Sequence, residues 1–112
     1  MKTVDALQSL AALSQESRLA AFRKLVQAGK QGMSVGDLRD RIDIPPATLS
    51  AHLNVLRAAK LVRDQREGRV IKVRANYTQM NALLAYLTEN CCAGDACDAG
   101  AACAPRQKGA KS

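Results

Sequence analysis

Aromatic side chains are scarce in this chain of 112 residues, which contains no tryptophan, one phenylalanine and two tyrosines. Apolar residues nevertheless make up 47% of the sequence, so a core must be built from leucine, valine, isoleucine and alanine. This composition favours a modest helical core within a single domain. So small a chain buries a limited fraction of its surface, and dimerisation is one way to bury more.

Long hydrophobic runs are also missing. No stretch approaches the ~18 uninterrupted apolar residues of a transmembrane helix. The N-terminal MKTVDALQSL has no apolar segment followed by a cleavage site. We therefore expect a cytoplasmic protein with no membrane partner. Clustered thiols stay reduced in that compartment, which favours metal binding or redox chemistry over a structural disulfide.

Cysteine is absent from the first ninety residues, and all four thiols fall within a short segment rich in alanine, glycine and aspartate. They are Cys91, Cys92, Cys97 and Cys103. Nothing bulky surrounds them, so they cannot form a core. Thiolates do bind soft metals and metalloids. We expect a folded unit over residues 1–90 and a flexible, Cys-rich ligand-binding tail over residues 91–112.

The net charge of +7 is unevenly distributed along the chain. From Arg57 to Arg74 there are seven basic side chains against two acidic ones, Asp64 and Glu67. A local basic patch on a small domain is typical of a protein that binds the phosphate backbone of nucleic acid. An ordinary solvated surface is the alternative reading of such a run.

Hydrophobic spacing predicts a mainly α fold with one β-hairpin. We expect helices over 4–13, 15–28, 35–42, 45–59 and 76–90, and strands over 61–66 and 70–74 around a turn at Glu67-Gly68. Ser14 and Ser34 are the expected N-caps of the second and third helices, and Gly29 is an expected C-cap. Two helices around the Pro45-Pro46 turn, followed by a basic hairpin, predict a winged helix-turn-helix.

The helix after the prolines is the expected reading helix. Leu49, Leu53 and Leu56 form its apolar stripe, and polar side chains off that stripe can reach base edges or phosphates. Arginines around the hairpin turn would contact phosphates or the minor groove. For His52, local packing is the alternative. The predicted DNA-binding residues are Ala47, Thr48, Ser50, Ala51, His52, Asn54, Arg57, Arg63, Arg66 and Arg69.

Four segments together carry a family resemblance. They are LSQESRL at 13–19, PATLSAHLNVLR at 46–57, Leu61-Val62 and REGR at 66–69. Over residues 5–90 the chain resembles the ArsR/SmtB family of metal-responsive repressors. The resemblance implies a homodimer that binds double-stranded operator DNA and releases it when an effector binds. It also puts Leu7, Leu10, Met80, Leu83 and Leu87 near the two-fold axis, as core or dimer contacts.

The segment YLTENCC at 86–92, followed by another cysteine, is similar to one branch of arsenite-responsive ArsR repressors, whose ligands lie just beyond the last helix. Two other family sites are empty here. The helix after Ser34 has no thiol, and residues 76–90 contain neither His nor Asp. The implied effector is As(III) or Sb(III) bound by Cys91, Cys92 and Cys97, with Cys103 as an extra thiol and no catalytic cofactor.

Three other readings of the thiols stay open. A divalent soft ion (Zn, Cd, Pb or Hg) could use all four cysteines, although an adjacent Cys-Cys pair fits zinc-knuckle spacing poorly. A thiol-redox switch could use a cysteine pair. A metallochaperone would leave the basic hairpin without a purpose. An enzyme is not expected, because His52 has no nucleophilic partner placed by the sequence.

Overall fold

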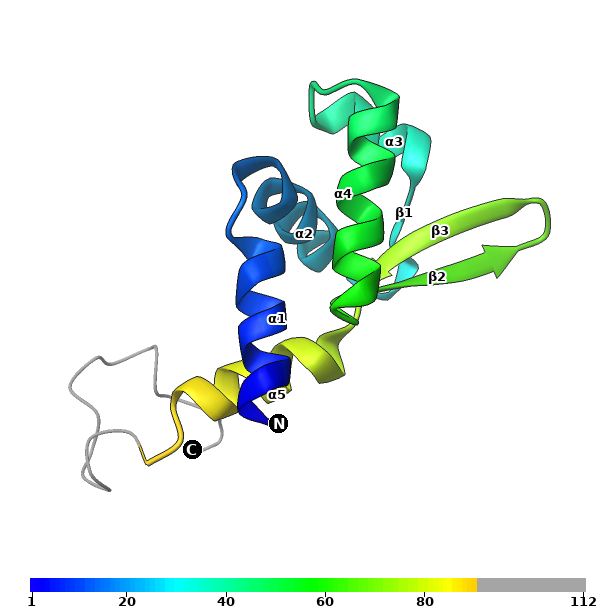
Figure 1. Cartoon of the computed structure of the whole chain (residues 1–112). Coiled ribbons are helices and arrows are strands. Elements are labelled where there is room, and N and C mark those ends of the chain that lie inside the picture. Colours follow the sequence, from blue (N-terminus) through cyan, green and yellow to red (C-terminus); the bar gives the residue numbers. More distant parts are fainter. Residues whose placement is uncertain (91–112) are drawn as a thin grey trace.

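The structure is a computed structural model that describes residues 1–90 and contains, within that range, five α-helices and a small antiparallel sheet (Figure 1). The elements are α1 (Thr3–Leu13), α2 (Glu16–Ala28), the 3-10 turn η1 (Gly29–Gln31), β1 (Met33–Ser34), α3 (Val35–Arg41), α4 (Pro46–Ala58), β2 (Val62–Glu67), β3 (Val70–Ala75) and α5 (Tyr77–Leu87). The predicted winged helix-turn-helix is confirmed, with α3 and α4 as the two helices and β2–β3 as the wing.

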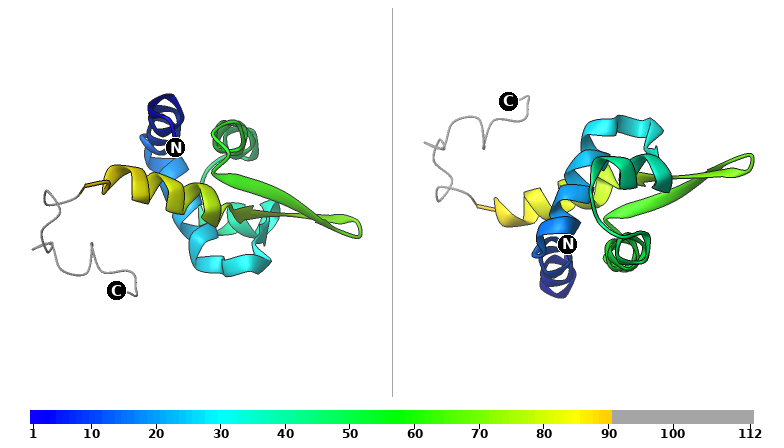
Figure 2. Two further views of the ribbon diagram at one scale, coloured as in Figure 1. Left: turned by 90° about the horizontal axis from the view of Figure 1, so that it is seen from below. Right: turned by 90° about the horizontal axis from the view of Figure 1, so that it is seen from above.

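The wing and the last helix lie at opposite ends of the molecule. In both views of Figure 2 the β2–β3 hairpin and α5 extend in opposite directions from the helices between them. The helix α4 stands beside α1 and α2, and contacts both. The helix α4 and the wing therefore share one part of the structure, while α5 leads the chain away from it.

The core is aliphatic, as the scarcity of aromatics requires. The stripe of Leu49, Leu53 and Leu56 on α4 is buried as predicted, and Phe22, the one phenylalanine, is 6% exposed. Leucine, isoleucine, valine and alanine side chains fill the rest of the interior. Those that are almost fully buried include Leu25, Leu38, Leu61 and Val73.

The helix ends confirm two predicted caps and correct a third. The Ser34 hydroxyl accepts a hydrogen bond from the Asp37 N–H at 3.1 Å, and Gly29 ends α2 with φ 77°. Ser14, predicted as the N-cap of α2, instead ends α1, where its hydroxyl donates to the Ala11 carbonyl at 2.7 Å. Gln15 caps α2, because its longer side chain reaches the Arg18 N–H at 2.9 Å.

The sheet differs from the prediction in two places. The strand β1, which is only two residues long and too short to show a pattern, pairs with β3 so that Met33 lies opposite Val73. Glu67, predicted to lie in the turn, is the last residue of β2 and pairs with Val70. Gly68 is the first of the two turn residues and has φ 63°, the position at which a type II′ turn carries glycine.

Gly32 is the residue that lets β1 reach the sheet. Its φ of 67° and ψ of −161° belong to a backbone region that is essentially restricted to glycine. A Cβ built on Gly32 would also overlap the carbonyl oxygen of Val73 and press against Arg74. Gly29 has nearly the same backbone angles, φ 77° and ψ −160°, but open space where its Cβ would be.

Alanine variants of these two glycines separate the effect of backbone strain on stability from that of steric overlap. Gly29→Ala should lower the free energy of unfolding by about 1–3 kcal/mol through backbone strain alone. Gly32→Ala should lose about 1–3 kcal/mol more, because the sheet must move to admit the methyl group. Urea denaturation of both variants measures the difference. Equal losses would mean that contact between Gly32 and β3 does not restrict this position.

Candidate nucleic-acid interface

The helix α4 has a buried leucine face and an exposed face on which Thr48, Ser50 and Asn54 stand among apolar residues. Two prolines start it: Pro45 is the N-cap and Pro46 the first helical residue, where a missing N–H loses no helical partner. Its leucine stripe fixes the helix against the core, so the opposite side faces outward. The predicted contact residues on that exposed side are Ala47, Thr48, Ser50, Ala51 and Asn54.

His52 lies apart from that exposed set. It is half-buried, and its Nδ1 lies 3.4 Å from Nη1 of Arg18 on α2. The Arg18 Nε also donates to the Ala12 carbonyl at the end of α1, at 2.7 Å. His52 thus faces the junction of α1 and α2, as in the local-packing alternative. Arg18 belongs to the LSQESRL segment, whose sequence gives no sign of this contact with His52.

Arg57 joins α4 to the wing. Its Nε and Nη2 lie 3.1 and 3.0 Å from Oδ1 of Asp64 on β2, and its Nη1 donates to Oδ1 of Asn54 at 2.9 Å. Both partners are side chains of the predicted interface region. Arg57 therefore already has three contacts within the protein. In the sequence Asp64 stands out only as one of two acidic residues within the basic run, and its pairing with Arg57 is not evident there.

The three predicted wing arginines are exposed but point in different directions. Arg63 pairs with Arg74 and Arg66 with Ile71, and alternate residues of a strand face opposite sides of a sheet. Arg63 and Arg66 therefore lie on opposite faces, and Arg69 is in the turn. Within residues 1–90 none of the three forms an ion pair. They form a wing positive on both faces, which suits contacts with phosphates on either side.

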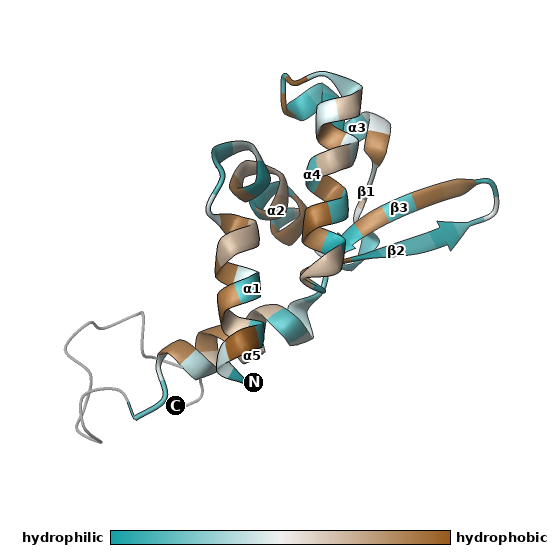
Figure 3. Cartoon of the chain, in the orientation of Figure 1, coloured by the Kyte–Doolittle hydropathy of each residue, from teal (hydrophilic) through white to brown (hydrophobic). Residues whose placement is uncertain are grey.

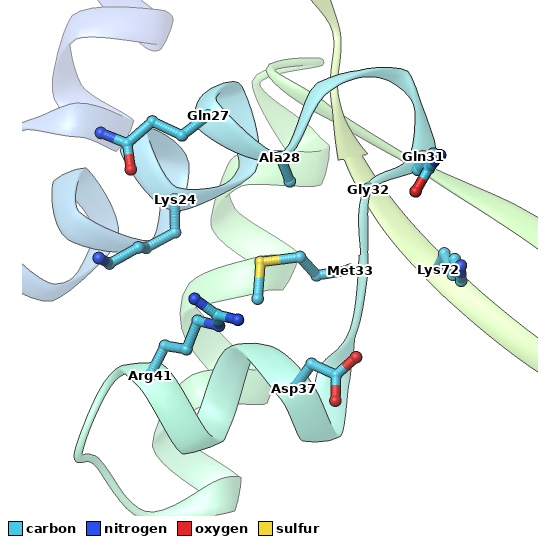
Figure 4. A pocket seen from close by; sticks show the side chains of 9 residues that line it. All are labelled: Lys24, Gln27, Ala28, Gln31, Gly32, Met33, Asp37, Arg41 and Lys72. Atoms are coloured by element: carbon cyan, nitrogen blue, oxygen red, sulfur yellow. The ribbon is translucent and has the colours of Figure 1, made fainter.

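A polar hollow of about 380 Å³ lies between α2, β1, α3 and β3. Figure 4 shows that the charged ends of Lys24, Arg41 and Lys72 do not point to a common centre. Lys72 also lies 3.5 Å from Glu67. The hollow contains none of the predicted DNA contacts.

The predicted thiol ligands Cys91, Cys92, Cys97 and Cys103 lie outside the described residues. Within residues 1–90 there is no group of three or more His, Cys, Asp or Glu side chains that could hold a metal ion. None of the helices in that range is long and apolar enough to cross a membrane.

Comparisons with known proteins agree with the helix-turn-helix arrangement described above. A family model described as a helix-turn-helix domain matches residues 13–65. The transcriptional repressor SdpR of Bacillus subtilis (strain 168) is 35% identical over 57 residues, which are 50% of this chain and 63% of SdpR. The chain thus spans less than two thirds of the length of that relative, and also of a second B. subtilis regulator, YceK, of which it covers 61%.

Solved structures extend the match beyond the helix-turn-helix. HlyU from Vibrio cholerae N16961 superposes with a TM-score of 0.63 at 28% identity, over 79% of this chain and 95% of HlyU. An ArsR-like transcriptional regulator from Rhodococcus sp. RHA1 superposes with a TM-score of 0.68 at 30% identity, over 78% of each chain. The chain therefore belongs to the ArsR/SmtB family of winged helix-turn-helix repressors.

Proposed function

We propose that this transcriptional regulator binds operator DNA as a homodimer and releases it when As(III) or Sb(III) binds the thiolates of Cys91, Cys92 and Cys97. The observation that carries the DNA-binding part is the exposed face of α4, with Thr48, Ser50 and Asn54, beside a wing with three exposed arginines. Contacts from the wing to phosphates would position the protein, and contacts from α4 to bases would provide specificity.

On this proposal α4 enters the major groove. Ser50 and Asn54 are exposed one turn apart and can hydrogen-bond to base edges. Ala47 and Ala51 offer methyl groups that suit contact with thymine methyls. Few long polar side chains stand on this face, so sequence-dependent DNA shape would supply part of the specificity.

The surface of α1 supports a homodimer. This helix packs its small residues Ala6, Ser9 and Ala12 inward and leaves Val4 and Leu7 67% and 60% exposed. An ordinary surface helix does the reverse, placing its large apolar residues in the core. Figure 3 shows further hydrophobic residues along α5, where Leu84 and Leu87 are more than half exposed.

Between α2 and α5 there is an apolar groove of about 430 Å³, with Leu19, Phe22 and Met80 among its lining residues. It adjoins the exposed end of α5, since Leu84 also lines it. A second copy of the chain would cover the groove together with the outer surfaces of α1 and α5. A two-fold dimer presents two reading helices, which would meet successive major-groove faces about 34 Å apart.

The thiols are well suited to a trivalent metalloid. As(III) and Sb(III) are soft and favour three thiolates in a trigonal pyramid, and Cys91, Cys92 and Cys97 lie within seven residues of one another. Closing so short a loop costs little entropy beyond ordering the chain itself. Including Cys103 would order six more residues, at about 1–2 kcal/mol of backbone entropy each.

Contacts at the start of α5 offer a route from the thiols to α4. The Asn76 side chain donates to the Lys60 carbonyl at 2.9 Å, directly after α4. The Gln79 amide lies 3.4 Å from the Ala59 carbonyl and from the buried Ser9 hydroxyl of α1. Binding that displaces the far end of α5 would therefore move contacts at the base of α4. The two reading helices would then no longer match the DNA spacing.

The dimer is tested by placing a charge on α1. Leu7→Glu should weaken self-association at least about tenfold, because an unpaired carboxylate buried in an apolar interface is strongly unfavourable. Val70→Glu is the matched control, since Val70 is 48% exposed on the distant wing. Sedimentation equilibrium gives the mass of each variant. A monomeric wild-type chain, or equal masses for the two variants, would contradict the proposed interface.

The wing is tested by the salt dependence of DNA binding. Replacing Arg66 and Arg69 together with alanine should flatten the slope of log affinity against log salt by roughly one to two units, through lost counterion release. Lys24 and Lys30, which lie outside the proposed interface, provide a double-alanine control with the same change in charge. An unchanged slope in the Arg66/Arg69 variant would remove the wing from the interface.

The effector is tested with single cysteine variants. Cys91→Ser, Cys92→Ser or Cys97→Ser should leave a repressor that binds DNA but no longer responds to arsenite, because three thiolates are needed. Cys103→Ser should still respond. Fluorescence anisotropy of labelled operator DNA measures release with As(III), Sb(III), Zn(II), Cd(II) and peroxide.

The other readings predict different responses in the same assay. Release by Zn(II) or Cd(II) with all four cysteines required would favour a divalent-ion sensor, and release by peroxide alone would favour a redox switch. Loss of response only in Cys103→Ser, or full response in a chain truncated after Asn90, would overturn the tail-sensor mechanism.

A further inference from the structure

We propose that Asp64 is a positioning residue that, through Arg57, fixes the Asn54 side chain so that its NH2 group is the end presented to DNA. This inference rests on the proposed function of α4 as the reading helix. It assigns a role in base recognition to a wing carboxylate that would itself repel DNA.

Arg57 is held at both ends of its guanidinium group. Two of its nitrogens lie 3.0 and 3.1 Å from the same Asp64 oxygen, and the third donates to Asn54 at 2.9 Å. The planar guanidinium makes these contacts in a fixed geometry. Because Asp64 belongs to β2 and Asn54 to α4, the position of the wing sets the position of the amide.

The contact with Arg57 also decides which way the Asn54 amide faces. A guanidinium group has donors only, so the Asn54 atom beside it must be the carbonyl oxygen. The NH2 group is then the end of this exposed side chain that remains available to a ligand. Asparagine recognises adenine by donating and accepting at once, which needs both ends. Held by Arg57, Asn54 presents its NH2 group first, which favours single hydrogen bonds to acceptors such as a purine N7, guanine O6, thymine O4 or a phosphate oxygen.

Electrostatics alone predicts no loss of specificity when the Asp64 charge is removed. The Asp64 side chain is 44% exposed within the basic run, where a carboxylate weakens attraction to phosphates. Removing its charge should therefore strengthen binding to any DNA. It should also free Arg57 to contact a phosphate. A positioning role predicts that specificity falls while non-specific affinity rises.

Glu67 is the matched control. It is also a wing carboxylate paired with one cation, since its Oε1 lies 3.5 Å from Nζ of Lys72, and its side chain is 49% exposed. Glu67 lies on β2 and Lys72 on β3, so this ion pair is formed within the wing and includes no residue of α4. Glu67→Gln thus removes the same charge without releasing Arg57.

The experiment compares a duplex selected from a random library by the wild-type protein with a scrambled duplex of the same length. Glu67→Gln should raise affinity for both duplexes. The ratio of the two affinities, selected over scrambled, should stay within about twofold of the wild-type ratio. Asp64→Asn should raise affinity for the scrambled duplex, steepen its salt slope by about one unit and lower the ratio about tenfold. Circular dichroism confirms that each variant is folded.

A double-mutant cycle connects the effect to Asn54. Asn54→Ala should lower the ratio in the wild-type background and have little further effect in Asp64→Asn, because the amide is no longer fixed there. Library selection with Asp64→Asn should raise the frequency of adenine at the base position that Asn54→Ala relaxes, because a released amide can donate and accept at once. If Asp64→Asn behaves like Glu67→Gln, or if its effect and that of Asn54→Ala add, the positioning role is wrong. A wild-type protein that prefers no duplex would instead overturn the proposed function itself.

Discussion

The joint at the C-terminal end of α4 is the constraint on which the reading helix depends. The N–H of Leu61 donates to the Leu56 carbonyl and that of Lys60 to the Arg57 carbonyl, the two bonds of a Schellman motif. Such a motif usually has glycine in its left-handed position, but here Lys60 takes that position with φ 64°. Asn76 holds the strained residue from outside, since its side chain donates to the Lys60 carbonyl and its N–H to the Leu61 carbonyl.

This joint places three functional elements around one short segment. The wing begins at Val62, directly after the joint, and α5 begins at Tyr77, directly after Asn76. The Tyr77 hydroxyl donates to the Val26 carbonyl at 2.8 Å, which ties the start of α5 to α2 as well. A change at α5 therefore reaches the reading helix and the wing through the same residues. In the proposed mechanism, this arrangement makes release of DNA a movement of one connected unit.

Much of the fold follows from local sequence signals, and the exceptions have physical reasons. The stripe Leu49–Leu53–Leu56 and the cap Ser34 could be predicted because a helical period and an N-cap depend on a few neighbouring residues. The strand β1 could not, because its pairing with β3 depends on a sequence-distant contact allowed by Gly32. Similarly, the basic run could be counted from the sequence, but not the pairing of Arg57 with Asp64 and Asn54. The thiol ligands lie outside the described residues and stay a prediction.

The two ends of α5 make different contacts, and in the proposed mechanism this helix transmits ligand binding to α4. Its first turn is held by Asn76, Tyr77 and Gln79. Its last turn contacts α1 through the hydroxyls of Tyr86 and Thr3 and leaves Leu84 and Leu87 more than half exposed. Eleven helical residues span about 16 Å, and such a helix moves as a rigid rod rather than compressing. Force applied beyond Leu87 would therefore act on the first turn, and through it on Lys60. In the proposed dimer, ligand binding and the two-fold contact would act on the same exposed end, so metalloid binding and DNA binding would be coupled through one helix.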